Sequence, residues 1–554
     1  MATSLTYADG RPVRARDIAR IKIGASLGPG PGSGPNPWPY DAAAPISPDL
    51  AGWLPFLRSA DSDINYDRDR LAARARDLVR NDAWAKGAIN RMLDAAVGAH
   101  FFPIPRPNWR ALARQFGPSF DLAWYRDFVS AIRNEWYLWA NDPNFQADAA
   151  ESQTVTQMFR TALRAKLVEG DGLGMMLWQP DAVRNGLARY ATRLQIIDPD
   201  RMSNPQEMID THDRRNGVQI NEAGAPVGYH IRRAHQYDWY DSVASITWDF
   251  FPRRTAWGRP VVVHDFDKER GGQHRGVGVL TVAMGRFRQL NRYDDASLKA
   301  ALIRATLGFF LTSPRDENDA SDSLSLQSAD GADEYFQNLA NALYNQQPVM
   351  INGARVPVLA PGEKLQVAAG PGSTDDYAAI QDSGHRSIAA ATGQATPEVS
   401  NDFSKLNYSS YRGALLQASK TLARIRGDFA SGFATPVYTA WMEEAIDRNP
   451  GLLPRGVRPD QFPELRAGLC GVRWIGPGRG WIDPVKERQG EVLGLDAGFG
   501  TLEDTCADIE GEYWEDRIDQ RAIEVAAMNE RGLKLPNWAA QAPANQADEK
   551  PQPI

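Results

Sequence analysis

The sequence predicts an α+β protein in which long helices flank a shorter β-rich region. Two observations carry this fold class. In several stretches apolar residues recur three and four positions apart, which is typical of amphipathic helices. Residues 186–265 instead hold short alternating or apolar runs separated by Gly, Pro and Asn, which is typical of strands joined by turns.

Length and composition bound the class of protein. The 554 residues are enough for about two to four domains of roughly 100–200 residues each. A hydrophobic content of 43% and a charged content of 24% are ordinary for a globular chain, and sixteen tryptophans can bury much area in cores or subunit interfaces. The net charge of −7 argues against tight binding of DNA, because phosphate neutralisation needs basic residues. It does not argue against a conduit that lets DNA pass.

Cysteine usage and hydropathy exclude further classes. Cys470 and Cys506 are the two cysteines, and neither lies in a C-x-x-C spacing, so we expect no metal site, no disulfide framework and a reducing compartment. The first residues lack the pattern of a signal peptide, and no run approaches 18 apolar residues, so no membrane association is expected.

The chain begins with a segment that we predict to be a flexible arm, residues 1–60. It contains GPGPGSGPNPWPY (Gly28–Tyr40), whose proline and glycine content is incompatible with a helix or a central strand. This run does not have the spacing of a phosphate-binding loop, which favours a linker.

Helices are predicted next. After Asp67 an amphipathic pattern runs to about residue 96, with a break at Asn81-Asp82, and a second helix spans Trp124 to Ala140. A strand is predicted at Gly174–Trp178. In the β-rich region, the turn residues from Asn221 to Gly224 predict a hairpin.

The middle of the chain is predicted to form a long helix, 276–307. Arg288, Arg292 and Lys299 fall roughly on one side of it, either as a functional surface or as an ordinary solvated face. Just before it, His264 and His274 could pair with Asp265 or Asp267 around a metal. Ligands at usable spacing are missing, so a metal site is not favoured.

An inserted unit follows, from Phe309 to Gly372. It holds an acidic, serine-rich segment that we expect to be partly disordered, a short helix at 335–344 and strands within 348–358. A helix at Tyr377–Thr392 is expected to return beside helix 276–307.

A polar loop, Gln394–Asn407, leads into the longest amphipathic helix. Ser409 and Ser410 are expected to cap this helix. Its apolar stripe continues for about six turns and consists of Tyr411, Leu415, Ala418, Leu422, Ile425, Phe429 and Phe433. Arg412, Lys420, Arg424 and Arg426 are expected on its wetter sides.

Several motifs along the chain together resemble one known family. They are VVHDFDKERGGQHRGVGVL (262–280), LAPGEK (359–364), RSIAAATG (386–393), NYSSYRGALLQASKTLARIR (407–426) and DPVKE (483–487). In this order they resemble the portal, or connector, proteins of lambda-type tailed phages. One departure is Gly278, where the family pattern has a serine.

The resemblance implies a portal fold: a β-containing wing, two stem helices, an inserted clip, a long helix after a tunnel loop, and a helical crown. The implied divisions are arm 1–60, wing 61–275, first stem helix 276–307, clip 308–374, second stem helix 375–393, tunnel loop 394–407, long helix and rest of wing 408–483, crown 484–538, and a disordered tail 539–554.

The resemblance also implies a function. Family members form a ring, dodecameric in the particle, at one capsid vertex; the ring nucleates head assembly and docks the terminase large subunit. It conducts double-stranded DNA in packaging and ejection. Major capsid, scaffold and head–tail connector proteins are the other implied partners, and the place is the virion, after synthesis in the host cytoplasm.

The implied DNA-channel residues lie in the tunnel loop and on the first stem helix. In the loop they are Asn401, Asp402, Phe403, Ser404, Lys405 and Asn407, with Lys405 at the tip expected to meet the DNA backbone. On the stem they are Arg288, Arg292 and Lys299. No catalytic residue, metal or cofactor is expected.

Two other readings stay open at this point. A phage-associated nuclease or protease fused to a structural module would need a carboxylate cluster on a strand, a Walker motif or a Ser/His/Asp arrangement, and we find none that is defensible. A monomeric adaptor would form no ring.

Overall fold

The structure is a computed structural model of the 554-residue chain. It describes residues 53–306, 349–351, 354–356, 374–404, 407–478 and 484–534. The chain divides into two compact units, Met1–Ser59 and Ala60–Ile554, and the elements below belong to the second. The expected arm up to residue 52, helix 335–344, the acidic segment, Lys405 and the tail from 539 lie outside the described residues.

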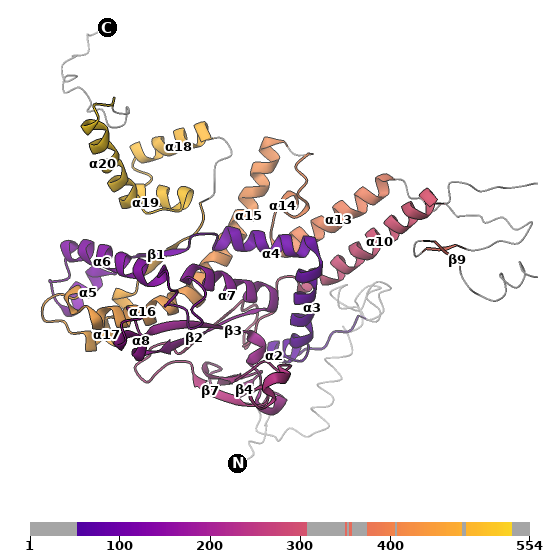
Figure 1. The fold of residues 1–554 in the computed structure, drawn as a ribbon, viewed down its shortest axis with the longest axis horizontal. Helices are drawn as coiled ribbons and strands as arrows, with labels where there is room; N and C mark the ends of the chain where they lie inside the picture. Colours follow the sequence, from indigo (N-terminus) through magenta and orange to yellow (C-terminus); the bar gives the residue numbers. More distant parts are fainter. Residues whose placement is uncertain are drawn as a thin grey trace, which may run out of the picture. The chain divides into compact units, whose positions relative to one another are not determined.

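Helices dominate the described part of the second unit (Figure 1). The α-helices are α2 Ala60–Ile64, α3 Arg68–Asn81, α4 Ala83–Ala96, α5 Trp109–Phe116, α6 Leu122–Ala140, α7 Val155–Glu169, α8 Pro180–Arg184, α9 Ser242–Ser245, α10 Met284–Thr306, α13 Thr374–Thr392, α14 Thr396–Ser400, α15 Tyr408–Phe429, α16 Thr435–Arg448, α17 Phe462–Leu469, α18 Pro484–Asp496, α19 Leu502–Thr505 and α20 Trp514–Glu530.

The strands form small antiparallel sheets. Their bounds are β1 Phe102–Pro105, β2 Asp171–Trp178, β3 Thr192–Ile197, β4 Arg214–Arg215, β5 Val218–Ile220, β6 Pro226–Arg232, β7 Trp248–Pro252, β8 Val262–Phe266, β9 Val349–Ile351, β10 Ala354–Val356 and β11 Val472–Ile475. The strand orders are β3-β2-β8, β4-β5-β6-β7, β1-β11 and β10-β9. The predicted α+β class is confirmed.

The first helices follow the predicted pattern, including its break. Asp82 separates α3 from α4, and its side chain accepts a hydrogen bond from the Ala85 amide at 2.8 Å, which caps α4. The apolar stripe of the two helices is buried except for Leu71, which is half-buried. The predicted helix at 124–140 is α6, and its start at Leu122 is capped by Asp121.

The predicted strand and hairpin are also present. Strand β2 begins at Asp171, three residues earlier than the sequence predicts, and lies between β3 and β8. The hairpin of β5 and β6 turns at Asn221, whose side-chain oxygen accepts from the amides of Ala223 and Ala225. Local turn chemistry therefore decided this hairpin.

One buried carboxylate joins several segments of the chain. Asp171 is fully buried, and its Oδ2 accepts from Arg68 Nη2 at 2.7 Å and from Arg275 Nε at 2.9 Å. Its Oδ1 accepts from His264 Nε2 at 3.0 Å and from the Gly276 amide at 2.8 Å. Burial acts to raise the pKa of Asp171, but the charges of Arg275 and Arg68 hold it well below its ordinary value. The carboxylate is therefore ionised and surrounded by donors.

Arg275 extends this cluster to the loops after β3. Its guanidinium donates to the carbonyl oxygens of Met202, Asn216 and Pro199 at 2.7 to 3.1 Å. A guanidinium has five N–H donors, so one side chain can satisfy several buried carbonyls at once. His264, Arg275 and Gly276 of the motif at 262–280 therefore form, with Asp171, a buried structural cluster that we call the hub.

Residues 276–283 correct a prediction. The helix expected from residue 276 begins at Met284, after a 3₁₀ turn at Thr281–Ala283. The preceding residues run along the end of α7, where the Val279 amide donates to the Leu167 carbonyl at 2.9 Å. A Cβ on Gly278 would overlap the Val168 carbonyl. Close backbone approach here replaces the helical turn that the periodicity predicts.

Helix α13 returns beside α10, as predicted (Figure 1). The rings of Tyr293 and Tyr377 stack with centroids 5.7 Å apart, and the Tyr377 hydroxyl donates to Asp294 at 3.0 Å. Nearer the core, Gly384 of α13 leaves room for the Leu290 side chain of α10. Between the two helices the described residues include the β9–β10 hairpin, where strands were predicted.

The long helix is interrupted, which the stripe did not indicate. After α15 the residues Ala430–Ala434 form a π-helical turn, and α16 follows. Pro436 lies in the first turn of α16; it has no N–H to donate back, and its ring disfavours the regular i→i−4 pattern. The stripe is buried at Ala418, Ile425, Phe429 and Phe433, but only half-buried nearer the start of the helix.

The main hydrophobic core forms around α16. Trp441 and Tyr438 are fully buried there and meet Trp136 at centroid distances of 5.1 and 5.4 Å. Trp474 of β11 packs on Phe101 at 5.0 Å. Part of the tryptophan content is therefore core, as the composition predicts. The last described residues are helical as well, in α18, α19 and α20.

Candidate functional site

The predicted loop 394–407 is partly helical, which corrects its extent. Thr396–Ser400 forms α14, with Pro397 in its first turn, and Pro397 and Val399 are buried. Proline is favoured in the first turn of a helix, so this signal was available in the sequence and was missed. The described non-helical parts are 394–395, 401–404 and Asn407.

The described loop residues make hydrogen bonds and a ring contact within the loop and with the start of α15. Asp402 Oδ1 accepts from the Ser404 amide at 2.9 Å and from its hydroxyl at 2.6 Å, which forms a local turn. The Phe403 ring is 49% exposed and meets the Tyr411 ring edge-on at 5.7 Å. Phe403 and Ser404 are thus the exposed end of the described loop, next to Lys405, which is not described.

The helix cap differs from the prediction. Asn407, not Ser409 or Ser410, caps α15: its side-chain oxygen accepts from the Ser410 amide at 2.8 Å and from the Ser409 hydroxyl at 3.0 Å. Asn407 therefore has a structural task at the helix start.

The other end of the loop rests on α4. Gln394 is buried, and its Nε2 donates to the Ala88 carbonyl at 2.6 Å. Asn401 ends α14 in the left-handed conformation with φ 55°, and its side-chain oxygen accepts from Arg91. Sequence analysis missed Arg91, because it precedes Asn401 by 310 residues and no local pattern links them.

Arg426 was expected to be solvated and is not. Its Nε donates to the Ala96 carbonyl at 3.1 Å and its Nη2 to the carbonyls of Ala95 and Pro477, at 2.6 and 3.2 Å. A cation at a helix C-terminus is favourable, since the last carbonyls of α4 have no partner within the helix.

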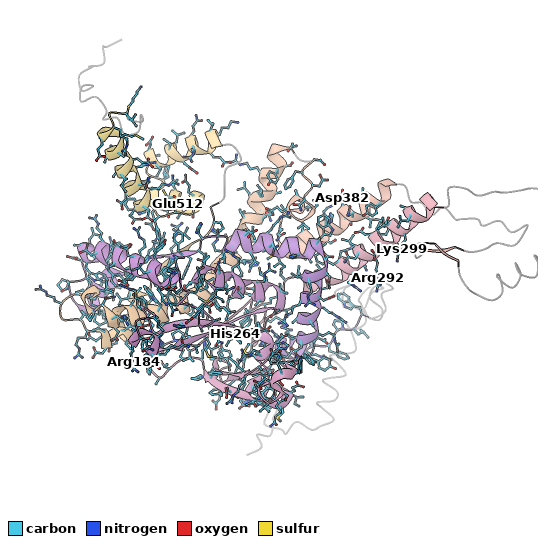
Figure 2. The ribbon with its side chains drawn as sticks, viewed as in Figure 1. Arg184, His264, Arg292, Lys299, Asp382 and Glu512 are labelled. Atoms are coloured by element: carbon cyan, nitrogen blue, oxygen red, sulfur yellow. The ribbon has the colours of Figure 1, made fainter. Side chains whose placement is uncertain are left out.

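The predicted basic residues of the stem share one exposed face of α10; Figure 2 labels two of them, Arg292 and Lys299. At 3.6 residues per turn, Arg292 and Lys299 lie only ~40° and ~20° around the helix from Arg288. Asp295 is exposed about 20° to the other side, so the face is of mixed charge. The spacing alone could have revealed Asp295.

The two histidines considered for a metal site each have hydrogen-bond partners within the protein. His264 donates to Asp171, and burial lowers its pKa, so it is neutral. His274 contacts Asp61 through Nδ1 at 2.8 Å and the Gly224 carbonyl through Nε2 at 2.9 Å. Both partners are acceptors, so both ring nitrogens carry protons, and the hydrogen bond to Asp61 raises the pKa of His274.

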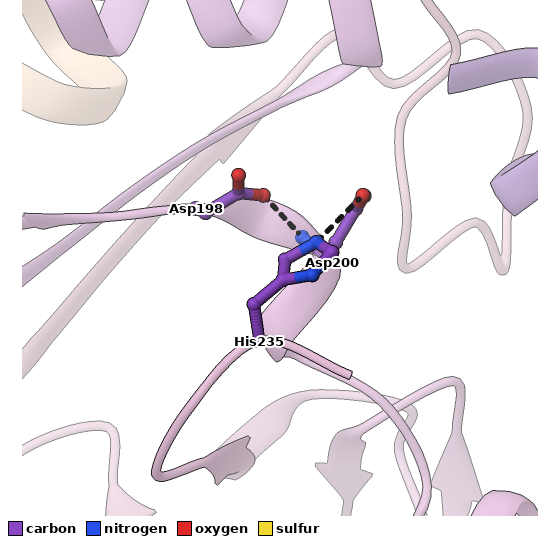
Figure 3. A group of neighbouring side chains, drawn as sticks. All are labelled: Asp198, Asp200 and His235. Carbon is purple, nitrogen blue, oxygen red and sulfur yellow. Dashed lines mark hydrogen bonds and ion pairs between the residues drawn. The ribbon is translucent and has the colours of Figure 1, made fainter. Parts of the chain in front are cut away.

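One other group of possible ligands lies close together within the described residues: Asp198, Asp200 and His235 (Figure 3). Arg76 occupies the position of a cation there, with Nη2 at 2.9 Å from Asp198 and Nη1 at 2.5 Å from Asp200. Arg76 thus already pairs with both carboxylates, and the arrangement is an ion-pair network.

A pocket of about 650 Å³ lies beside α16, next to Trp257. Two of the acids that line it, Glu443 and Glu444, are engaged in structural contacts. Both oxygens of Glu444 accept from backbone amides of Ala191 and Thr192, and Glu443 accepts from Trp257 Nε1 at 2.7 Å. This set of contacts holds α16 and β3 in place and leaves no activated nucleophile–base pair among these groups.

Comparison with known proteins decides the family. The sequence matches the family model "Phage portal protein, lambda family" over residues 47–426, more than half of the chain. The chain belongs to the lambda family of phage portal proteins. The resemblance drawn from the motifs is thereby confirmed.

Curated relatives that are portal proteins align with nearly the whole of this chain. It is 31% identical to the portal protein of Escherichia phage N15 over 499 residues, which are 89% of this chain and 91% of that protein. It is 30% identical to portal protein B of Escherichia phage lambda over 497 residues, with 89% and 90% covered. A probable portal protein of Halomonas phage phiHAP-1 is 23% identical over 485 residues.

Among solved structures, the portal chain is similar to a chain in the virion of a native gene transfer agent particle. The TM-score is 0.37 at 14% identity, covering 79% of this chain and 92% of that chain. Family membership makes this chain a structural protein of a phage and not an enzyme. Among the described residues, no helix is long and apolar enough to span a membrane.

Proposed function

We propose that this chain forms a dodecameric portal ring at one vertex of a phage capsid. The ring nucleates head assembly with the major capsid and scaffold proteins and docks the terminase large subunit. It conducts double-stranded DNA in packaging and ejection and then holds the head–tail connector proteins. The observation that carries this proposal is the family match over residues 47–426, together with relatives aligned over 89% of the chain.

The domain roles are part of the proposal. We assign the wing to 61–275, the clip to 308–374, the crown to 484–538, and the rest of the wing with the long helix to 408–483. We assign α10, which starts at Met284, as the first stem helix and α13 as the second stem helix. We restrict the tunnel loop to the residues between α14 and α15, because α14 occupies part of the range first predicted for it.

Exposed apolar side chains support a ring. They lie on both stem helices, on α15 and in the crown, and they are Leu298, Leu302, Ile380, Leu416, Val485, Val492 and Leu493. Closed rotational symmetry would cover such surfaces between neighbouring copies. The central hole would then be lined by the same residues from each copy.

Weak contacts with DNA fit both the charge and the geometry. We propose that Lys405, Ser404 and Phe403 form the channel-facing tip, and that Arg288, Arg292 and Lys299 of α10 line the channel below it. Asp295 on the same face of α10, and the net charge of −7, keep the phosphate attraction low. Asn401 and Asn407 have structural contacts and are the weaker candidates for DNA contact.

The first test is the particle mass of the purified protein by mass photometry, with negative-stain images. Twelve copies of the 61.2 kDa chain come to roughly 730 kDa, and we expect rings with a central hole wide enough for a duplex. A species of one or two subunit masses, unchanged when the capsid partners are added, would contradict the ring.

Replacing the loop lysine tests the channel. We expect Lys405→Ala to leave ring assembly intact and to lower DNA packaging or retention by a few-fold, because each copy loses one contact with phosphate. DNA per particle is measured after assembly with the variant ring. Lys420→Ala, on an exposed position of α15, is the matched control and should change neither quantity. If Lys405→Ala prevents ring formation, the loop lies at a subunit contact and not in the channel.

A further inference from the structure

Helix α4 contacts, at its start, both helices proposed as the stem. Asp82, which caps α4, accepts from Asn291 Nδ2 of α10 at 2.9 Å through its second carboxylate oxygen. Two residues further along, Trp84 packs on His385 of α13 with ring centroids 4.4 Å apart. His385 is buried. The first turn of α4 therefore lies against both α10 and α13.

Further along, the same helix contacts the loop and the long helix. Ala88 accepts from Gln394, and one turn later Arg91 donates to Asn401, so the two ends of segment 394–401 are fastened to consecutive turns. At the last turn, Arg426 of α15 donates to the carbonyls at 95 and 96. Each contact uses a different turn of one 14-residue helix.

We propose that α4 is the base that positions the tunnel loop, with Arg91 as the positioning residue. This inference deepens the proposed function, because it rests on the loop meeting DNA. Beyond Asn401 the contacts of the described loop include its own turn, the hydrogen bond from the Asp402 amide to the Ser400 hydroxyl and the Phe403–Tyr411 ring contact. Asn401 sets the start of this turn, because its left-handed backbone reverses the chain direction. Arg91 donates to the side chain of this same residue.

A physical consequence follows from the rigidity of a helix. Asp82, Trp84, Ala88 and Arg91 are carried by one hydrogen-bonded element, so a shift of α4 against the core carries the loop and the bases of α10 and α13 together. The loop moves independently only when the Arg91 contact opens. A long arginine side chain that donates one hydrogen bond at the protein surface can be released, since the net contribution of such a bond to stability is modest.

Hydrogen exchange of the assembled wild-type and variant proteins tests the proposal. We expect Arg91→Ala to raise amide exchange about tenfold in peptides covering 394–407, through loss of one charge-assisted hydrogen bond, and to leave peptides of α7 and α16 unchanged. Arg91→Lys, which keeps a donor, should restore part of the protection. Arg80→Ala, at an exposed position in the last turn of α3, is the matched control and should have no effect on the loop.

A second variant removes the acceptor and keeps the backbone. Asn401→Gly retains the left-handed conformation, and its exchange should match that of Arg91→Ala. The double variant should exchange no faster than either single one. Unchanged loop exchange in Arg91→Ala, or additive effects in the double variant, would overturn the proposal. If Arg91→Ala disturbs α4 itself, the loop exchange of Asn401→Gly alone tests the proposal, since that substitution leaves α4 intact.

DNA retention in particles built with the same variants separates this inference from the proposed function. Faster loop exchange with lower DNA retention and intact rings supports both. Faster loop exchange with normal retention supports the positioning by Arg91 and contradicts a role of the loop in holding DNA.

Discussion

Asp171→Asn is expected to destabilise the protein by about 3–5 kcal/mol, because it removes the nearest counter-charge of two buried arginines. Arg68 keeps the more distant carboxylates of Asp69 and Asp200, at 3.4 and 3.9 Å. Arg68 and Arg275 both donate to Oδ2 of Asp171, and the side chains of Arg275 and Asp171 are fully buried. An amide of the same size accepts on one atom only, and its NH₂ group would face the donors. Urea or guanidinium unfolding of the variant measures the change as a lower midpoint.

The matched control is the same substitution in an exposed ion pair. Asp181 pairs with Arg184 at 3.0 Å, with side chains 81% and 73% exposed. Asp181→Asn should change the free energy of unfolding by less than about 1 kcal/mol. Equal effects of the two substitutions would mean that the hub around Asp171 is not formed.

The hub also predicts a direction of pH dependence. The folded-state pKa of Asp171 lies below the ordinary value of 3.8, so the unfolded chain binds its proton more readily. The contribution of Asp171 is therefore fully present above that ordinary value, and it is lost as the pH falls through the folded-state pKa.

Gly278→Ala is expected to cost about 3 kcal/mol, through overlap of the new Cβ with the backbone. The atom it meets is the carbonyl oxygen of Val168 in the last turn of α7, which cannot rotate away as a side chain would. The segment would have to move from α7, and the Val279–Leu167 hydrogen bond would weaken. Thermal unfolding of the purified protein measures the loss.

Gly285→Ala is the control, seven residues further along. Nothing lies within 4 Å of a Cβ built on Gly285, in the first turn of α10. Alanine is the better helix former there by about 1 kcal/mol, so this variant should be neutral or slightly more stable. A neutral Gly278→Ala would show that 276–283 does not pack against α7 as described.

The candidate site was only partly predictable. The basic face of α10 follows from spacing, and the polar loop before α15 follows from composition, as predicted. The extent of that loop was wrong, since α14 and its buried Pro397 and Val399 take its first half. Arg91 was beyond reach, because the contact with Asn401 depends on how α4 packs under the loop.

By itself the sequence determined the elements whose signals are local, and the family. The break at Asp82, the hairpin at Asn221 and the helical pattern of α13 depend on residues a few positions apart, where hydrogen bonding and periodicity act directly. The motifs around 262–280 and 407–426 identify a portal protein without any geometry.

Only the tertiary structure decided what those motifs do. Periodicity gave a helix from 276, but contact of Gly276 and Gly278 with the end of α7 holds that segment extended. The sequence predicts that Arg426 is a solvated cation, whereas in the structure it donates to a carbonyl at the end of α4. Asp171 becomes a hub only when residues about a hundred positions away are folded around it. Such contacts depend on burial and on the meeting of distant segments, which no local pattern records.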